Sequence, residues 1–164
     1  MEKNLLNGKK ILIVDDEPDV IDTLEEYLEM ADVVRASNFT EAQELLTTQH
    51  FDFAILDIMG VDGYRLLEIA RERKIIALML TAHALSPKET LKSFKKGAAS
   101  FVPKEKMENI VLYLNDLMEA QKKGRNFWWR WFDRFGDFYD KKFGAEWQEE
   151  NKDSWESLKY SDRL

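Results

Sequence analysis

Acidic side chains follow two apolar runs of the chain, in positions that suit phosphoryl chemistry. KILIV is followed by Asp15, Asp16 and Glu17, and Asp57 ends the run FAILD. If the two runs are neighbouring strands, these carboxylates converge, and their mutual repulsion raises their pKa values. A hard divalent cation relieves that repulsion, and oxygen ligands of this kind suit Mg²⁺.

A hydroxyl and an ammonium follow two later apolar runs. Thr81 ends the run IIALMLT, and Lys104 follows ASFVP. Beside a phosphoryl group, these two side chains would hold its oxygens, and Asp57 would be the nucleophile that accepts the group. Each acid also has an ordinary explanation, since Asp15 and Asp16 could cap a helix and Asp57 could lie in a turn. The hypothesis therefore depends on all of these residues occurring together, each after its own apolar run.

The elements that must position these residues are short apolar runs alternating with helical patterns. Near-continuous apolar runs are typical of parallel strands covered on both faces. Such an alternation favours an α/β fold with a doubly wound parallel sheet, which binds ligands at the carboxyl ends of its strands. The expected strands are 10–15, 32–37, 51–57, 75–81 and 99–103, and the expected helices are 18–30, 40–46, 63–73, 86–97 and 106–123.

Two of the expected helices begin with a capping-box pattern. Thr40 stands three residues before Gln43, and Ser86 stands three residues before Glu89. Gly97 is expected to end the second of these helices.

Composition excludes several classes of protein. The net charge is −7, with 31 acidic against 24 basic residues, which argues against a nucleic-acid partner. The absence of cysteine excludes disulfides and thiolate metal sites. The N-terminus lacks the apolar stretch of a signal peptide, and no window is long enough to span a membrane, so we expect a cytoplasmic protein.

Residues 9 to about 120 resemble the receiver domain of CheY-like response regulators, the phosphoacceptor module of two-component signalling. The resemblance implies a five-stranded sheet of order 2-1-3-4-5, as in flavodoxin-like folds. It also implies that a histidine kinase or phosphotransfer protein phosphorylates Asp57 with the help of Mg²⁺. The chain would then be a stand-alone signalling protein and not an enzyme, apart from hydrolysis of its own acyl phosphate.

The same resemblance assigns the metal ligands. Asp16 would bind Mg²⁺ directly, Asp15 would act partly through water, and Asp57 and the backbone carbonyl of Met59 would complete the set. The loop DIMGVDG after the phosphoacceptor is shorter than is usual in the family and lacks its proline. This difference bears on the geometry at Met59.

The resemblance also assigns the groups around the phosphoryl oxygens. Lys104 would pair with them, Thr81 would move in to hydrogen-bond them, and Phe101, at the aromatic switch position, would turn inward as it does so. The family usually has a lysine joined to proline by a cis bond, whereas here Glu105 follows Lys104. We expect either a trans bond with a rearranged loop or a strained cis bond.

Some residues and functions stay open at this point. Phe101 could be only a core residue, and His83 could tune access to the site or be a solvated loop residue. The chain could also be a degenerate receiver that binds partners without phosphorylation. A haloacid-dehalogenase-like phosphatase uses similar groups, but its nucleophile follows the first strand in a DxD pattern that this chain lacks.

The sequence divides into an expected receiver domain, 1–123, and an aromatic extension, 124–164, which holds all five tryptophans. Drawn as a helix, 127–147 has one broad aromatic face, which is too large to be left in water. The face contains Phe127, Trp128, Trp131, Phe132, Phe135, Phe138, Tyr139 and Phe143, opposite Arg130, Asp133, Arg134, Asp137, Asp140 and Lys141.

Four arrangements could keep this face out of water. It could pack on the fifth helix or on a second copy and form a dimerisation element. It could instead dock another protein, lie in a membrane interface, or belong to a small output domain, for which the segment is short. We hypothesise that phosphorylation changes what the aromatic helix covers.

Overall fold

The computed structural model describes residues 5–82, 86–123 and 128–159. Within these ranges, five parallel strands form one sheet of order β2-β1-β3-β4-β5, which confirms the expected fold. The elements are β1 (Lys10–Val14), α1 (Pro18–Tyr27), β2 (Asp32–Ala36), α2 (Phe39–Thr48), β3 (Phe53–Asp57), α3 (Gly63–Glu72), β4 (Ile76–Thr81), α4 (Pro87–Lys95), β5 (Ser100–Pro103), the 3₁₀ turn η1 (Lys104–Asn109), α5 (Ile110–Lys123), α6 (Trp128–Phe143), the 3₁₀ turn η2 (Glu149–Asn151) and α7 (Lys152–Lys159).

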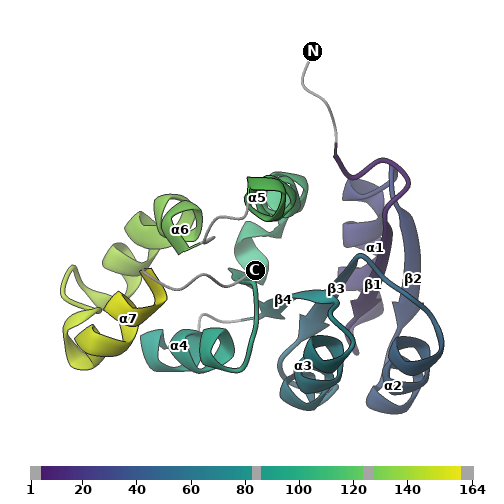
Figure 1. The fold of residues 1–164 in the computed structure, drawn as a ribbon, viewed down its shortest axis with the longest axis horizontal. Helices are drawn as coiled ribbons and strands as arrows, with labels where there is room; N and C mark the ends of the chain where they lie inside the picture. Colours follow the sequence, from purple (N-terminus) through teal and green to yellow (C-terminus); the bar gives the residue numbers. More distant parts are fainter. Residues whose placement is uncertain (1–4, 83–85, 124–127, 160–164) are drawn as a thin grey trace.

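Helices cover both faces of the sheet, as the apolar runs predicted. Figure 1 shows α1 and α5 on one face and α2, α3 and α4 on the other. All five residues of β3, the central strand, are buried. Parallel register places Val14 of β1 beside Leu56 of β3, and Asp57 beside Leu80 of β4. The carboxyl ends of these strands therefore meet at one edge of the sheet.

The start and end of α4 follow the sequence prediction. Ser86 Oγ accepts a hydrogen bond from the backbone N–H of Glu89 at 3.0 Å. Gly97 follows the helix with φ +106°, a conformation that residues with a side chain rarely adopt.

The predicted cap of α2 was wrong by two residues. The cap is Asn38, whose Oδ1 accepts from the backbone N–H of Glu41 at 2.9 Å. Glu41 in turn accepts from the Ser37 N–H at 3.2 Å. The side chains of Asn38 and Glu41 thus bond the free N–H groups at the start of the helix, the role predicted for Thr40 and Gln43.

Among the five helices around the sheet, two bounds differ from the prediction by more than two residues. The first helix was expected to reach residue 30 but ends at Tyr27. The fifth was expected to begin at residue 106, but Lys104–Asn109 form a 3₁₀ turn and α5 begins at Ile110.

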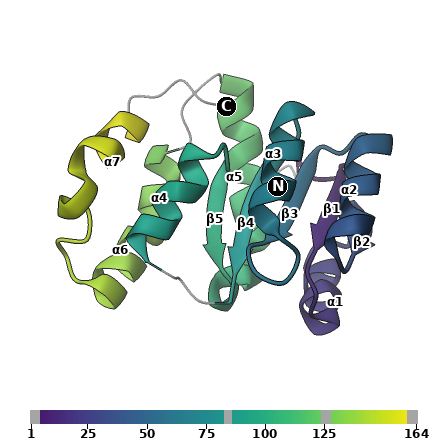
Figure 2. The ribbon, with the colours of Figure 1, turned by 90° about the horizontal axis from the view of Figure 1, so that it is seen from below.

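The C-terminal extension folds into α6 and α7, which cover the outer edge of the sheet beside β5 (Figures 1 and 2). Helix α6 runs antiparallel to α5, because Arg134 contacts Asp116 whereas Lys142, further along α6, contacts Glu105 before α5 begins. The predicted helix 127–147 ends earlier, at Phe143, and Phe127 lies outside the described residues.

The centre of the aromatic face of α6 is buried inside the same chain, and Phe132, Phe138 and Phe143 are partly buried. Trp131 and Tyr139 are fully buried, and Phe135 nearly so. Trp131 packs edge-on against Phe94 of α4 with ring centroids 5.2 Å apart, and Phe135 lies 4.9 Å from Tyr113 of α5. Packing on the fifth helix is thus confirmed, and the three buried rings of the described face need no second copy to cover them.

Polar contacts join α6 to each of the three elements beneath it. Trp131 Nε1 donates to the carbonyl of Phe101 in β5 at 2.9 Å. The hydroxyl of Tyr139 lies 2.6 Å from that of Thr90 in α4. Arg134 makes two hydrogen bonds to Asp116 of α5, at 2.9 and 3.2 Å.

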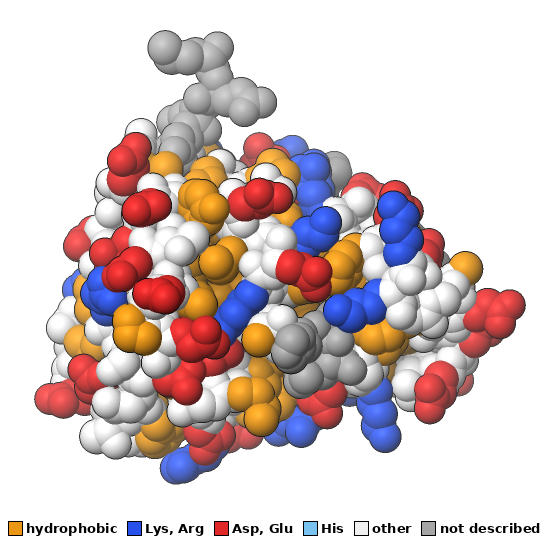
Figure 3. Space-filling model, turned by 180° about the vertical axis from the view of Figure 1, so that it is seen from behind, with side chains coloured by type: hydrophobic (Ala, Val, Ile, Leu, Met, Phe, Trp, Pro, Cys, Tyr) orange, Lys and Arg blue, Asp and Glu red, His pale blue; other side chains and the backbone are white. Residues whose placement is uncertain are grey.

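The surface is mixed in charge. Acidic and basic side chains are interspersed on the face shown in Figure 3. Among the described helices, none is both long and apolar enough to cross a membrane.

Candidate functional site

Three strands deliver acidic and basic groups to the same edge of the sheet. Asp15 directly follows β1, and Asp57 is the last residue of β3. Lys104 directly follows β5 and begins η1. This is the convergence that the sequence predicted for the carboxyl ends of a parallel sheet.

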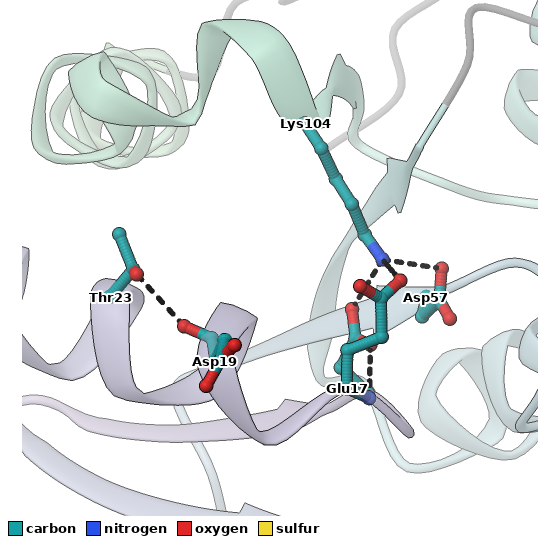
Figure 4. Close-up of polar contacts among 6 residues, drawn as sticks. Glu17, Asp19, Thr23, Asp57 and Lys104 are labelled. Atoms are coloured by element: carbon teal, nitrogen blue, oxygen red, sulfur yellow. Dashed lines mark hydrogen bonds and ion pairs between the residues drawn. The ribbon is translucent and has the colours of Figure 1, made fainter.

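Lys104 lies among the acids. Its Nζ is 2.9 Å from Asp15 Oδ2, 3.2 Å from Glu17 Oε1 and 3.5 Å from Asp57 Oδ1. Figure 4 shows its side chain extending from the end of the strand into the gap between Glu17 and Asp57. The ammonium therefore bridges the acids that follow β1 and the acid that ends β3.

The two inner carboxylates are almost completely buried. The Asp15 side chain is 1% exposed and that of Asp57 is 6% exposed, whereas Glu17 is open to solvent. Burial, reinforced by the charge of Asp15, raises the pKa of Asp57 to about 7, although the ammonium of Lys104 opposes this shift. Burial also raises the pKa of Asp15.

Lys104 remains positively charged in this setting. Burial alone would lower its pKa, but the hydrogen bond to Asp15 and the charges of Asp57 and Asp15 together raise it. One ammonium faces two buried carboxylates and the exposed Glu17, so the site keeps an excess of negative charge.

The acids fit a divalent cation. Carboxylate oxygens of Asp15, Asp16 and Glu17 lie within 4.8 Å of one another. Asp15 Oδ2 is buried, and the ammonium of Lys104 lies 2.9 Å from it. A hard cation takes oxygen ligands of this kind, and the excess negative charge favours it.

The loop after Asp57 is tightly packed on the site. Gly60 has φ +85°, and a Cβ atom there would lie 2.5 Å from Asp16 Oδ2. A Cβ atom on Gly63 would lie 2.1 Å from the backbone oxygen of Asp57. The short loop therefore depends on two glycines, one beside Asp16 and one beside the backbone of Asp57.

The remaining predicted site residues lie at different depths. Thr81 ends β4, one position beyond the partner of Asp57, and is 2% exposed. The Phe101 side chain is fully buried in β5, and the Met59 side chain is 66% exposed. His83 lies outside the described residues.

The bond between Lys104 and Glu105 is trans, since the described residues contain no cis peptide bond. Of the two expectations, the trans bond is therefore confirmed. The chain turns directly from β5 into η1, with Pro103 before the lysine as the N-terminal cap residue of the turn.

Sequence reasoning did not assign roles to Glu17 and Gly60. Glu17 was noted only as the third acid after β1, yet it pairs with Lys104. Its position beside Asp15 and Asp16 was the sequence feature that could have indicated a role at the site. The close approach of Gly60 to Asp16 could not be found without the path of the loop.

The model of the response regulator receiver domain matches residues 11–115. The chain belongs to this family. Response regulator SaeR of Staphylococcus aureus strain USA300 is 31% identical over 119 residues, which cover 69% of this chain and 52% of SaeR. This chain thus spans about half the length of the curated relatives it matches.

Solved receiver structures are similar in fold. A CheY-like receiver protein from Methanospirillum hungatei is 28% identical, with a TM-score of 0.64 over 71% of this chain and 98% of its own. A Burkholderia pseudomallei response regulator, solved with a phosphorylated aspartic acid and a calcium ion, is 25% identical. Its TM-score is 0.60, over 71% of this chain and 72% of its own. Membership of the receiver family removes the phosphatase alternative.

Proposed function

We propose that Asp57 is the phosphoacceptor of a response regulator and receives its phosphoryl group from a histidine kinase or phosphotransfer protein. The observation that supports this most strongly is the ammonium of Lys104, placed between the buried carboxylates of Asp15 and Asp57 at the strand ends. A phosphorylated aspartic acid in the related Burkholderia protein gives independent support.

In the proposed transfer, a carboxylate oxygen of Asp57 attacks the phosphorus of a phosphohistidine. The new P–O bond forms as the P–N bond breaks, and the imidazole leaves with the electron pair of that bond. Asp57 must be ionised to attack, so its raised pKa favours transfer at neutral pH and above.

Three residues would respond to the product. Lys104 would pair with the phosphoryl oxygens, as a cation already within reach of Asp57. Thr81 would hydrogen-bond them from the neighbouring strand, because a phosphoryl group adds acceptor oxygens and negative charge. Phe101, on the edge strand, would report this shift to α4 and α5.

Asp15, Asp16, Asp57 and the Met59 carbonyl would hold Mg²⁺. When bound, the ion supplies positive charge against the carboxylates and the phosphoryl oxygens. The close packing of Gly60 on Asp16 would keep that carboxylate facing the site.

The output would lie on the surface of α4, β5 and α5 and in the extension, 124–164, beyond a receiver domain, 1–123. We propose that the chain acts as a stand-alone regulator, by contacts of the extension, which packs on α4, β5 and α5, with a partner protein or a second copy. The packing of α6 across all three elements supports a link between the site and the extension.

Acetyl phosphate and Mg²⁺ test the proposal directly. We expect an adduct of one phosphoryl group in the intact mass of the native chain, and none with Asp57→Asn or with EDTA. If neither acetyl phosphate nor a histidine kinase gives an adduct, the chain is a degenerate receiver that binds partners without phosphorylation.

A further inference from the structure

The segment that contains Lys104 is held by α6 on both sides of the lysine. We infer that Trp131 and Phe138 of α6 are positioning residues, which fix the backbone of β5 and η1 so that the ammonium of Lys104 reaches Asp15 and Asp57. This inference rests on the proposed function, because it concerns how the phosphoryl site is kept ready for its ligand.

The first contact lies before the lysine. Trp131 is fully buried, and its Nε1 donates to the carbonyl of Phe101, three residues ahead of Lys104. Strand β5 is four residues long and forms the edge of the sheet, paired with β4 alone. An edge strand has unpaired backbone groups on its outer side. The hydrogen bond from the indole of Trp131 therefore restrains a strand that pairs with the sheet on one side only.

The second set of contacts lies after the lysine. Lys142 Nζ lies 3.6 Å from Glu105 Oε1, and Lys106 Nζ lies 5.4 Å from the centre of the Phe138 ring. Glu105 and Lys106 are the two residues that follow Lys104 in η1. The side chains of α6 therefore touch the chain at positions −3, +1 and +2 relative to the lysine.

Lys104 needs such support because its own backbone provides little. It stands where a short edge strand changes into a 3₁₀ turn, whose hydrogen bonds have poorer geometry than those of an α-helix. Glu105 follows it, so no proline ring restrains the next residue. The long lysine side chain also loses rotamer freedom when it is held among three carboxylates.

Helix α6 is itself firmly anchored away from the lysine. Arg134 makes two hydrogen bonds to the buried Asp116 of α5, and Tyr139 bonds Thr90 of α4 within the core. Trp131 also stacks on Trp155 of α7, with ring centroids 6.4 Å apart. The helix can thus support β5 and η1 before a ligand arrives.

The consequence is that the extension pre-organises the phosphoryl site. Holding β5 and η1 in place before a ligand arrives reduces the ordering cost of binding, so docking of α6 and binding of a phosphoryl analogue favour each other. Loosening the contact at Trp131 should therefore weaken a ligand that touches none of α6.

Matched tryptophan substitutions test this in the full chain. Trp131→Phe keeps a ring but removes the donor to Phe101. Trp147→Phe removes the same donor group within the extension, where Nε1 bonds Asp140 at 2.9 Å and not β5. Phe138→Ala removes the ring beside Lys106. Each variant is compared by amide hydrogen exchange of residues 101–106 in the metal-free protein and by calorimetric titration with beryllofluoride and Mg²⁺.

We expect Trp131→Phe to raise exchange at residues 104–106 and to weaken beryllofluoride binding by about fivefold, the worth of one hydrogen bond. Phe138→Ala, which removes the ring beside Lys106, should change both in the same direction. Trp147→Phe should change neither. Equal affinity in Trp131→Phe and the native chain overturns the inference, as does an equal loss in Trp147→Phe. If the native chain itself binds no beryllofluoride, the proposed function is wrong and the inference falls with it. That result differs from equal binding by the native chain and Trp131→Phe, which overturns the inference alone.

Discussion

Replacing Asp57 by asparagine should stabilise the metal-free protein at neutral pH. The Asp57 carboxyl is nearly buried beside Asp15, and its pKa is raised from 3.8 to about 7. Ionising it in the folded state therefore opposes folding, and asparagine has a similar shape without the charge. Lys104 keeps Asp15 and Glu17 as partners in this variant.

The sign and size follow from proton linkage. Between about pH 4 and 7 the folded state holds a proton on Asp57 that the unfolded state has released, so stability falls as pH rises through this window. A shift from 3.8 to about 7 corresponds to at most about 4 kcal/mol above pH 7. Relief of nearby charges reduces this, so we expect Asp57→Asn to gain roughly 2–4 kcal/mol at pH 8 and little at pH 4.5.

Urea unfolding at the two pH values, with and without MgCl₂, measures the effect. Mg²⁺ should stabilise the native chain and narrow its gap to Asp57→Asn, because it binds the folded carboxylates. Asp32→Asn is a matched control, since Asp32 is exposed at the opposite end of the sheet. If the free energy of unfolding changes with pH in the same way in the native chain and in Asp57→Asn, then Asp57 does not have a raised pKa in the folded protein.

Three further predictions concern the loop and the extension. Gly60→Ala places a Cβ atom against Asp16 at positive φ, which costs roughly 1–3 kcal/mol of strain. Calorimetry should therefore show Mg²⁺ binding weakened about tenfold, and unchanged affinity would place the ion away from Asp16. A double-mutant cycle of Asp116→Ala and Arg134→Ala should give a coupling of about 1–3 kcal/mol in urea unfolding, because the paired carboxylate is buried; additive effects would contradict this. Ending the chain after Lys123 should expose the apolar surface under α6 and cause self-association in sedimentation, and a well-folded monomer would show that α6 is not part of the core.

The strand ends were predictable from sequence because a parallel sheet places all its carboxyl ends at one edge. An apolar run precedes each of Asp15, Asp57, Thr81 and Lys104, and each run predicts a strand with that residue at its carboxyl end. The order of the acids, hydroxyl and ammonium along the chain then indicated the family. Each of these signals is local in sequence, since it lies within a few residues of the side chain concerned.

The features that were missed depend on the path of the chain in three dimensions. Asn38 rather than Thr40 caps α2, and because both residue types serve as caps, the sequence alone does not choose between them. The helical wheel gave the aromatic face of α6 but not its cover, because amphipathicity shows that a face is buried and not against what. The support of Lys104 by α6 joins residues about 30 positions apart, which no local pattern indicates.

Locating the phosphoryl group tests the central claim most directly. After treatment with acetyl phosphate and Mg²⁺, borohydride reduction converts a phosphorylated aspartate into homoserine, which peptide mass spectrometry can place. We predict homoserine at position 57 and aspartate unchanged at positions 15 and 16. Homoserine at another position, or none in a chain that binds Mg²⁺, would contradict the assignment of Asp57 as the phosphoacceptor.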